Sequence, residues 1–295
     1  MLNPLDKVVS SISLQLFLSQ LRSSKVKKEV WTNSDSISIE DALRLDLLKD
    51  MYQSDSYNYS NTTALNDRSH GDLFEALSNI FVKKVLHTTV DVQEINGLSA
   101  SKSNVRERRS MDEFVQIDCR HLSEISEQNF RVNFNHQEIE ILHLPCTTDH
   151  LVMYGWHSML YLNNKAGSHH FAAMRHIASR LEKKVPIACR MELTYLDELA
   201  IKHFNKKYKC YLFNKNYEKK LKDLTELNNL PSLFFFNGRY LPYNTGLLIF
   251  RKSDWRLFKF EENAINQVIT DFNAELEKLY LLQQSNEKFQ EYLSR

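Results

Sequence analysis

Glycine and proline are scarce in this chain, which has six glycines and five prolines among 295 residues. A β-sandwich made of many short strands needs frequent turn residues, so this scarcity argues against such a fold. Asn, Lys, Ser and Leu are plentiful instead. The composition favours a helix-rich α+β protein that is long enough to bury a proper core.

An excess of charge of one sign is also missing, because 38 basic residues stand against 37 acidic ones. No overall field would attract nucleic acid or a membrane, and binding to DNA would need a local patch. No apolar run is long enough to span a membrane, and residues 2–21 predict an amphipathic helix and not a signal peptide. We therefore expect a cytoplasmic protein without a membrane partner.

Cysteine is sparse, and the chain has none of the common nucleotide or nucleophile motifs. The four cysteines are far apart and have mostly apolar neighbours, which predicts buried thiols in a reducing compartment; they are Cys119, Cys146, Cys189 and Cys210. Gly-x-x-x-x-Gly-Lys-Ser/Thr, Gly-x-Gly-x-x-Gly and Gly-x-Ser-x-Gly are absent. The commonest kinase, dehydrogenase and hydrolase interpretations are thereby removed.

Residues 156–178 contain the most informative stretch. An apolar run ending at Asn163-Asn164 predicts a strand, and residues 171–178 predict a helix. Gly167 in the turn between them tolerates a positive φ and would let a ligand approach the backbone. With Ser168 as N-cap, the free amides of the first helical turn would form a small anion site. The alternative is a plain connecting turn.

The sequence Gly167-Ser168-His169-His170, followed by Ala172-Ala173, resembles the Gly-x-x-Arg-plus-Ala box of the ParB/sulfiredoxin-like superfamily. That superfamily next has a Val-Pro strand and an Asp-led helix, and this chain has Val185-Pro186 and then Asp197 at suitable distances. The resemblance spans about residues 156–205. It implies a central mixed sheet and a turn, Gly167 to His170, that binds nucleotide phosphates. Superfamily branches segregate DNA, cut nucleic acid, phosphorylate small molecules or repair oxidised cysteine.

Two departures from the superfamily pattern limit what the resemblance implies. Ser168 stands where sulfiredoxins have cysteine, so thiol chemistry is not implied. His170 stands where arginine is usual, and it would carry less charge at neutral pH.

The candidate catalytic residues are His169 and Asp149. His169 would act as nucleophile or general base near the phosphates, and Asp149 would hold a nucleotide-bound Mg²⁺ or activate a hydroxyl. Arg175 would either reach a phosphate or extend outward. The expected ligand is ATP or another nucleoside triphosphate, with or without Mg²⁺. Six histidines lie between His143 and His176, but none has tight ligand spacing, and we expect no protein-bound metal.

The whole chain predicts three regions: a helix-rich part (1–112), an α/β core of ParB/sulfiredoxin-like type (113–215) and a C-terminal hairpin with a long helix (216–295). Two helices are expected within residues 1–50 and one over 72–81. Further strands are expected at the following positions: 85–92, 114–117, 130–134, 139–144, 233–236, 246–250 and 255–260. The last helix is expected from about residue 262 to the end.

Two other functions remain open. The segment from Lys202 to Lys222 combines many lysines with aromatic residues, as nucleic-acid-binding surfaces do, and would suit a nuclease-like or DNA-binding module of a mobile-element or phage-defence system. Alternatively, its lysines are solvated and its aromatics form core. A non-enzymatic interaction protein that forms a homodimer through the apolar face of the last helix is the third possibility.

Overall fold

The computed structural model describes residues 36–39, 67–144, 146–214, 216, 234–237, 245–255 and 269–295. The helix predicted at 2–21, the helix predicted to start at Ser38 apart from its first two residues, and most of the loop predicted at 53–70 lie outside these residues. No described helix is long and apolar enough to cross a membrane.

The chain folds into two compact units, each made of separate segments. One unit includes Leu45–Phe81 and Asp197–Leu279, and the other includes Asn33–Arg44, Val82–Leu196 and Tyr280–Arg295. Each unit takes segments from both sides of residues 112 and 215, an arrangement that hydrophobic patterns along the chain do not indicate. We call them the first and the second unit.

The second unit has a mixed sheet of five strands in the order β1-β5-β3-β4-β2. Strand β3 pairs parallel with β5 and antiparallel with β4, and β4 pairs parallel with β2. The strands are β1 (Phe81–Asp91), β2 (Gly97–Leu98), β3 (His150–Tyr154), β4 (Leu160–Asn163) and β5 (Pro186–Leu196). The protein is thus α+β with a central mixed sheet, and the strands predicted near 85–92 and 185–190 are confirmed.

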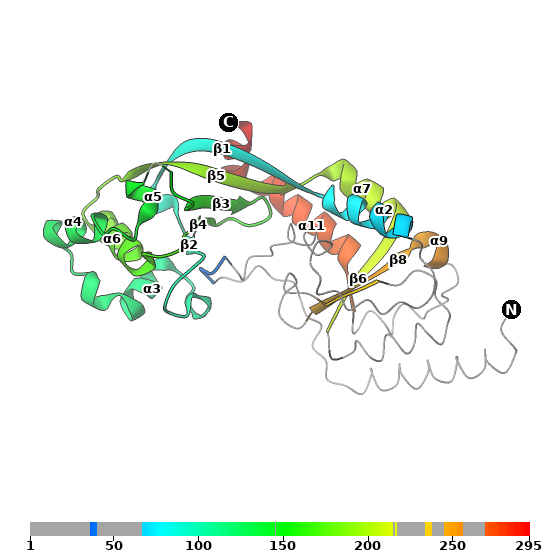
Figure 1. Cartoon of the computed structure of the whole chain (residues 1–295), viewed down its shortest axis with the longest axis horizontal. Helices are drawn as coiled ribbons and strands as arrows, with labels where there is room; N and C mark the ends of the chain where they lie inside the picture. The colour runs from blue at the N-terminus through cyan, green and yellow to red at the C-terminus, as the bar shows by residue number, and fades with distance from the viewer. Residues whose placement is uncertain are drawn as a thin grey trace, which may run out of the picture. The chain divides into compact units, whose positions relative to one another are not determined.

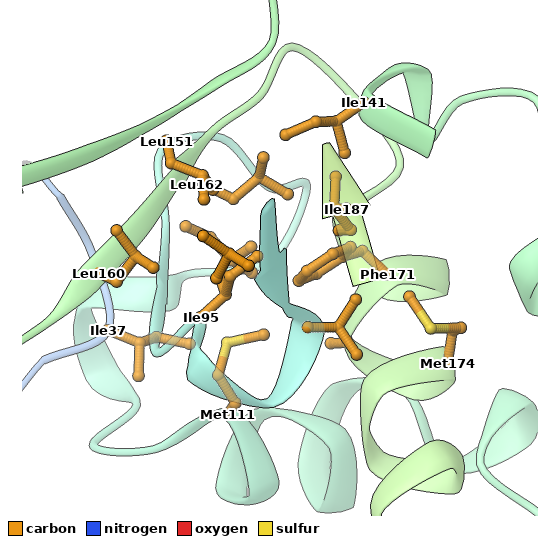
Figure 2. Packing of buried hydrophobic residues seen from close by; sticks show 14 of the residues in the cluster. Ile37, Ile95, Met111, Ile141, Leu151, Leu160, Leu162, Phe171, Met174 and Ile187 are labelled. Carbon is orange, nitrogen blue, oxygen red and sulfur yellow. The ribbon is translucent and has the colours of Figure 1, made fainter. Parts of the chain in front are cut away.

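Helix α6 (Ser168–Arg180) is the centre of the helical layer, because it packs against both α3 (Met111–Asp118) and α4 (Glu127–Phe134) (Figure 1). Its buried side includes Phe171, Met174 and Ala178. Figure 2 shows Phe171 and Met174 converging with strand residues such as Ile187 on one interior. Burying an aromatic or large aliphatic side chain of this kind contributes about 1.5–3 kcal/mol each. This packing fixes α6 on the sheet.

Three segments predicted as strands are helices: residues 114–117 lie in α3, 130–134 in α4 and 139–144 mostly in α5. Ser110 accepts from the Glu113 amide at 3.0 Å, and Ser126 accepts from the Asn129 amide at 3.1 Å. These N-cap side chains accept hydrogen bonds from first-turn amides, which have no partner within a helix. In a strand the same amides would pair with a neighbouring strand. The short apolar runs looked alternating because helix and strand spacing are hard to separate over so few residues.

The remaining elements of the second unit are short. Its helices are α3 (Met111–Asp118), α4 (Glu127–Phe134), α5 (Glu140–His143) and α12 (Glu287–Ser294), with 3-10 turns η2 (Val92–Glu94), η3 (Val105–Glu107) and η4 (Arg120–Leu122).

The first unit has an antiparallel sheet in the order β7-β8-β6-β9. Its elements are α2 (Asp67–Ser78), α7 (Glu198–Lys207), β6 (Tyr208–Asn214), β7 (Phe234–Asn237), β8 (Thr245–Arg251), α9 (Lys252–Trp255) and β9 (Ile269–Asp271). The predicted strands at 233–236 and 246–250 and the helix at 72–81 are confirmed, with shifted ends. The strand predicted at 255–260 starts inside a helix, and residues 256–260 lie outside the described part.

The predicted C-terminal helix is confirmed over most of its described part, but it is interrupted and begins later than expected. β9 precedes α11 (Phe272–Ser285), and α12 follows after Asn286. Asn286 Oδ1 accepts from the Phe289 amide at 3.1 Å and its Nδ2 donates to the Gly155 and His157 carbonyls, both at 3.0 Å. These bonds cap the new helix and hold its start, so the chain does not continue as one helix.

Helix α7 begins with Asp197, as the Asp-led pattern predicts. Asp197 Oδ1 accepts from the Ala200 amide at 2.7 Å. We expect Asp197→Ala to lower the free energy of unfolding by about 1 kcal/mol, measured by urea denaturation, because a cap bond is lost. Asp197→Asn keeps the acceptor and should stay near wild type. Equal stability of the Ala variant and wild type would disprove the capping role.

Candidate functional site

The turn between β4 and α6 is held firmly by neighbouring segments. Ser99 Oγ exchanges hydrogen bonds with both the amide and the carbonyl of Asn164, each at 2.9 Å. Asn164 Nδ2 donates to the Ala166 carbonyl at 2.7 Å and to Ser168 Oγ at 2.9 Å. The Ser168 hydroxyl donates in turn to the Ala100 carbonyl. Ser168 is therefore buried and tied to the protein, and it is not the N-cap of the helix.

Gly167 is the N-cap residue, with a left-handed φ of 75°. A Cβ added here would lie 2.5 Å from the Glu138 carbonyl oxygen. The space beside this glycine is filled by protein backbone, so Gly167 serves the close approach of two chain segments. A ligand does not enter on that side, which corrects the role predicted for it.

Helix α6 nevertheless begins with no side-chain cap on its amides. The first amides of a helix have no partner within it, and the helix dipole places partial positive charge there. His169 and His170 lie in this first turn and are both partly exposed.

His169 contacts residues that sequence reasoning missed. Its Nε2 lies 2.9 Å from Ser103 Oγ, and its ring packs 5.3 Å from that of Phe114. Burial lowers the pKa of His169, although the nearby Asp118 acts in the opposite direction. The imidazole is thus kept neutral near pH 7, the form that accepts a proton.

Asp118 ends α3 and forms an ion pair with Arg108. Arg108 Nε donates to Asp118 Oδ2 at 2.7 Å, and Arg108 Nη2 lies 3.4 Å from Oδ1. The hydrogen bond from Arg108 is the largest cause that lowers the pKa of Asp118. The carboxyl is therefore ionised at neutral pH, and Arg108 is occupied by this ion pair.

His170 points to different partners. Its Nδ1 lies 2.8 Å from Oδ1 of Asn133, and its ring stacks on that of His136 at a centroid distance of 3.5 Å. Burial is the largest cause that lowers the pKa of His170, and the charge of His136 adds to it. We call His136, His169 and His170, with Ser103 and Asp118, the histidine site.

Asp149 and Arg175 are not ligand-facing members of this site. Asp149 is buried, and its Oδ1 accepts from the Lys165 amide at 3.2 Å, so it fastens the turn. Burial raises the pKa of Asp149. A buried carboxyl bonded to backbone does not fit the expected role of holding a Mg²⁺ ion.

Arg175 lies two turns along α6, roughly 10 Å from its first residue. Its Nη2 donates to the Gln93 carbonyl at 3.1 Å, and Gln93 Nε2 donates back to the Arg175 carbonyl at 2.9 Å. Burial lowers the pKa of this guanidinium. Arg175 therefore packs against η2 and does not lie at the turn.

The other histidines that the sequence places near the turn have separate partners. His143 lies 2.8 Å from the Phe134 carbonyl, His150 3.2 Å from Asn163 Nδ2, and His176 2.8 Å from Asp112. Within the described part of the chain, no three His, Cys, Asp or Glu side chains are grouped to hold a metal ion.

The aromatic residues of the predicted nucleic-acid segment are mostly core. Phe204, Tyr208, Tyr211 and Phe213 are all buried, so they cannot stack on bases. Lys202 pairs with Glu198 and Lys209 with Asp271. Residues 215 and 217–222 lie outside the described residues. The interpretation with lysines outside and aromatics inside therefore holds where the structure describes this segment.

The apolar face of the last helices is also occupied. Phe272, Leu276 and Leu279 of α11 are buried within the chain, as are Phe289 and Tyr292 of α12. These side chains pack within the chain itself. Their burial does not support a homodimer formed through this face.

Taken together, the chain is an α+β protein with a histidine-bearing helix N-terminus beside a central sheet. It belongs to a family described as a family of unknown function (DUF6685), whose model matches residues 85–288. No curated protein and no solved structure matches the chain. The matched range contains every residue of the histidine site, but the family assigns no activity to it.

Gly167→Ala tests the packing role of the glycine. We expect it to lower the free energy of unfolding by about 2 kcal/mol or more, because a side chain would adopt a left-handed conformation and collide with backbone. Urea denaturation measures the change. The matched control is Glu182→Gly, since Glu182 has a φ of 56°. There, the stability gained by relieving the left-handed strain should nearly cancel the stability lost through the greater flexibility of glycine. A Gly167→Ala protein as stable as wild type would refute the close approach.

The lowered pKa of His170 predicts a loss of stability in acid. The unfolded chain takes up the proton near pH 6.5, whereas the folded chain takes it up only at lower pH. Stability present above pH 6.5 is therefore lost as the pH falls through the folded pKa. Unfolding measured between pH 7.5 and 5 should show a weaker pH dependence for His170→Gln than for wild type.

The control for this experiment is Gln137→Ala, an exposed and non-titrating neighbour, which should leave the slope unchanged. An unchanged slope in His170→Gln would contradict the prediction.

Proposed function

We propose that the protein binds a nucleotide at the N-terminus of α6 and hydrolyses it or transfers its phosphoryl group, with His169 as general base. The observation that carries this proposal is the pairing of a neutral, partly exposed His169 with an uncapped helix start. Uncapped helical amides suit phosphate oxygens, and a neutral imidazole suits proton removal.

The wider arrangement supports a ParB/sulfiredoxin-like core as part of the same proposal. Strand β4, the glycine turn, helix α6 and strand β5 follow one another in the order that the superfamily has. In this protein the glycine would shape the turn, and the phosphate contacts would come from the first-turn amides and from Lys102, whose charge acts on His169. Charge on a nearby lysine favours an anionic ligand.

In the proposed reaction, His169 removes the proton from a water molecule or an acceptor hydroxyl. The oxygen so activated forms a bond to the terminal phosphorus, and the bond to the leaving phosphate oxygen breaks, with the electron pair retained by that oxygen. The helix amides would hold the transferred group while its charge shifts. Mg²⁺ would enter only as the counterion of the nucleotide, because Asp149 does not fit as its ligand.

Thermal unfolding with ATP, CTP and GTP, with and without Mg²⁺, tests the binding part. A ligand that binds only the folded state raises the melting temperature in proportion to its occupancy. We expect at least one nucleotide to raise it, and an increase in salt concentration to weaken the effect. The absence of any rise with all three nucleotides would refute the proposal.

Turnover of the same nucleotide, followed with a radiolabelled terminal phosphate, tests the catalytic part. We expect His169→Gln to lower kcat by roughly 10²–10⁴-fold while the nucleotide-induced rise in melting temperature remains, because the base is lost and the amides stay. His203→Gln, at an exposed position on α7, is the matched control. Turnover that survives in His169→Gln would remove His169 from the mechanism.

A further inference from the structure

The segment of residues 99–103 runs beside the start of α6 and is held there by three contacts. Ser99 is hydrogen-bonded to the turn that precedes the helix, and the Ala100 carbonyl accepts from the side chain of the first helical residue. The third contact joins Ser103 Oγ to His169 Nε2 at 2.9 Å. The first two contacts fasten the segment, and the third brings a hydroxyl to an imidazole.

Local hydrogen bonds also fix the backbone on both sides of Ser103. Ser101 Oγ accepts from the Ser103 amide at 3.1 Å. Asn104 Oδ1 accepts from the Arg106 amide at 3.3 Å, which caps η3 directly after the serine. Serine and asparagine side chains commonly hold turns in this way. An ordered loop therefore presents the Ser103 hydroxyl to a ring whose own helix is fixed by the core.

A serine hydroxyl within hydrogen-bond reach of a neutral imidazole is the arrangement that activates serine as a nucleophile. Ser103 and His169 are both only partly exposed, so substrate can reach them while much of the surrounding water is excluded. Although burial lowers the pKa of His169, the charge of Asp118 raises it, and this charge favours the imidazolium that forms when the ring takes up the serine proton.

We propose that Ser103 is a catalytic nucleophile with His169 Nε2 as its base, so that phosphoryl transfer passes through a covalent phosphoseryl intermediate. The inference rests on the proposed function and names the hydroxyl that His169 activates first. Ser103 Oγ already lies at hydrogen-bond distance from Nε2, whereas a water molecule at that nitrogen would have to displace it.

The reaction then has two displacements at phosphorus. In the first, the Ser103 proton moves to Nε2, Oγ bonds to the terminal phosphorus, and the nucleoside diphosphate leaves with the electron pair and takes the proton from the imidazolium. In the second, His169 removes a proton from water or an acceptor hydroxyl, whose oxygen bonds to the same phosphorus. Oγ leaves with its electron pair and recovers a proton from the imidazolium. The first-turn amides of α6 would hold the phosphoryl oxygens in both steps.

A fluorophosphonate tests the nucleophile without a nucleotide, because attack by an activated serine forms an oxygen–phosphorus bond and expels fluoride. We expect mass spectrometry of the full chain treated at pH 8 to place the adduct on Ser103, and prior unfolding in urea to prevent it. His169→Gln should slow this labelling by about 10²–10⁴-fold, because the base is lost. Ser179→Ala, at an exposed serine of the same helix, is the matched control and should label at the wild-type rate.

A wild-type chain that carries no adduct on Ser103 would overturn the proposal, and so would labelling that is equally fast in His169→Gln. The wild-type result decides the role of the serine even if a variant is unstable. Melting temperatures of the variants show whether a loss of labelling reflects the missing side chain or unfolding.

A nucleotide labelled in its terminal phosphate distinguishes this proposal from the proposed function. After an acid quench we expect labelled phosphate on Ser103, and we expect Ser103→Ala to lower kcat by at least about 10²-fold while the nucleotide still raises the melting temperature. If Ser103→Ala turns over nucleotide as fast as the wild type, the proposed function stands and the nucleophile fails. If the fluorophosphonate labels Ser103 but no nucleotide binds, the nucleophile stands and the proposed function fails.

Discussion

The contact between Gly167 and the carbonyl of Glu138 determines where α6 begins. A side chain at this position would push the two segments apart, so only glycine lets the chain turn left-handed and start the helix there. The start of α6 in turn sets the direction of every residue in its first turn. His169 consequently faces the loop that carries Ser103, and His170 faces α4.

Core packing in the second unit also fixes the position of α6. Phe171 and Met174 are fully buried among the strand side chains, so α6 can neither rotate nor slide without opening the core (Figure 2). A rotation by one residue, about 100°, would turn this face away from the core. The orientation of both imidazoles is thus a consequence of core packing and not of the polar contacts alone.

Sequence reasoning located the elements with clear local signals and missed the contacts between distant segments. The strand at 85–92, the helix after Gly167 and the Asp197 cap each depend on neighbouring residues, and each is confirmed. The short apolar runs at 114–117 and 130–134 predict strands, whereas the N-caps Ser110 and Ser126 indicate the helices that the structure has at 111–118 and 127–134. Cap residues decide such cases, because segments of this length have little periodicity.

Local sequence patterns cannot predict the partners of the two histidines, for a different reason. Ser103 lies 66 residues from His169, and Asn133 lies 37 residues from His170. Packing of α6 against α4 brings His170 to Asn133, whereas Ser103 comes from the segment before η3, and no spacing rule predicts either contact. Sequence alone likewise placed Asp149 and Arg175 in the right neighbourhood but could not show that the protein itself occupies both.

Two adjacent histidines of α6 contact different elements through different ring nitrogens. A buried acceptor or donor that loses its partner costs about 1–3 kcal/mol, so the hydrogen bonds around the buried Asn133 constrain one another. The Asn133 amide, held by two carbonyls, presents Oδ1 to His170 Nδ1, whereas Ser103 Oγ lies beside His169 Nε2. In the proposed reaction His169 is the base, whereas His170 is stacked on His136.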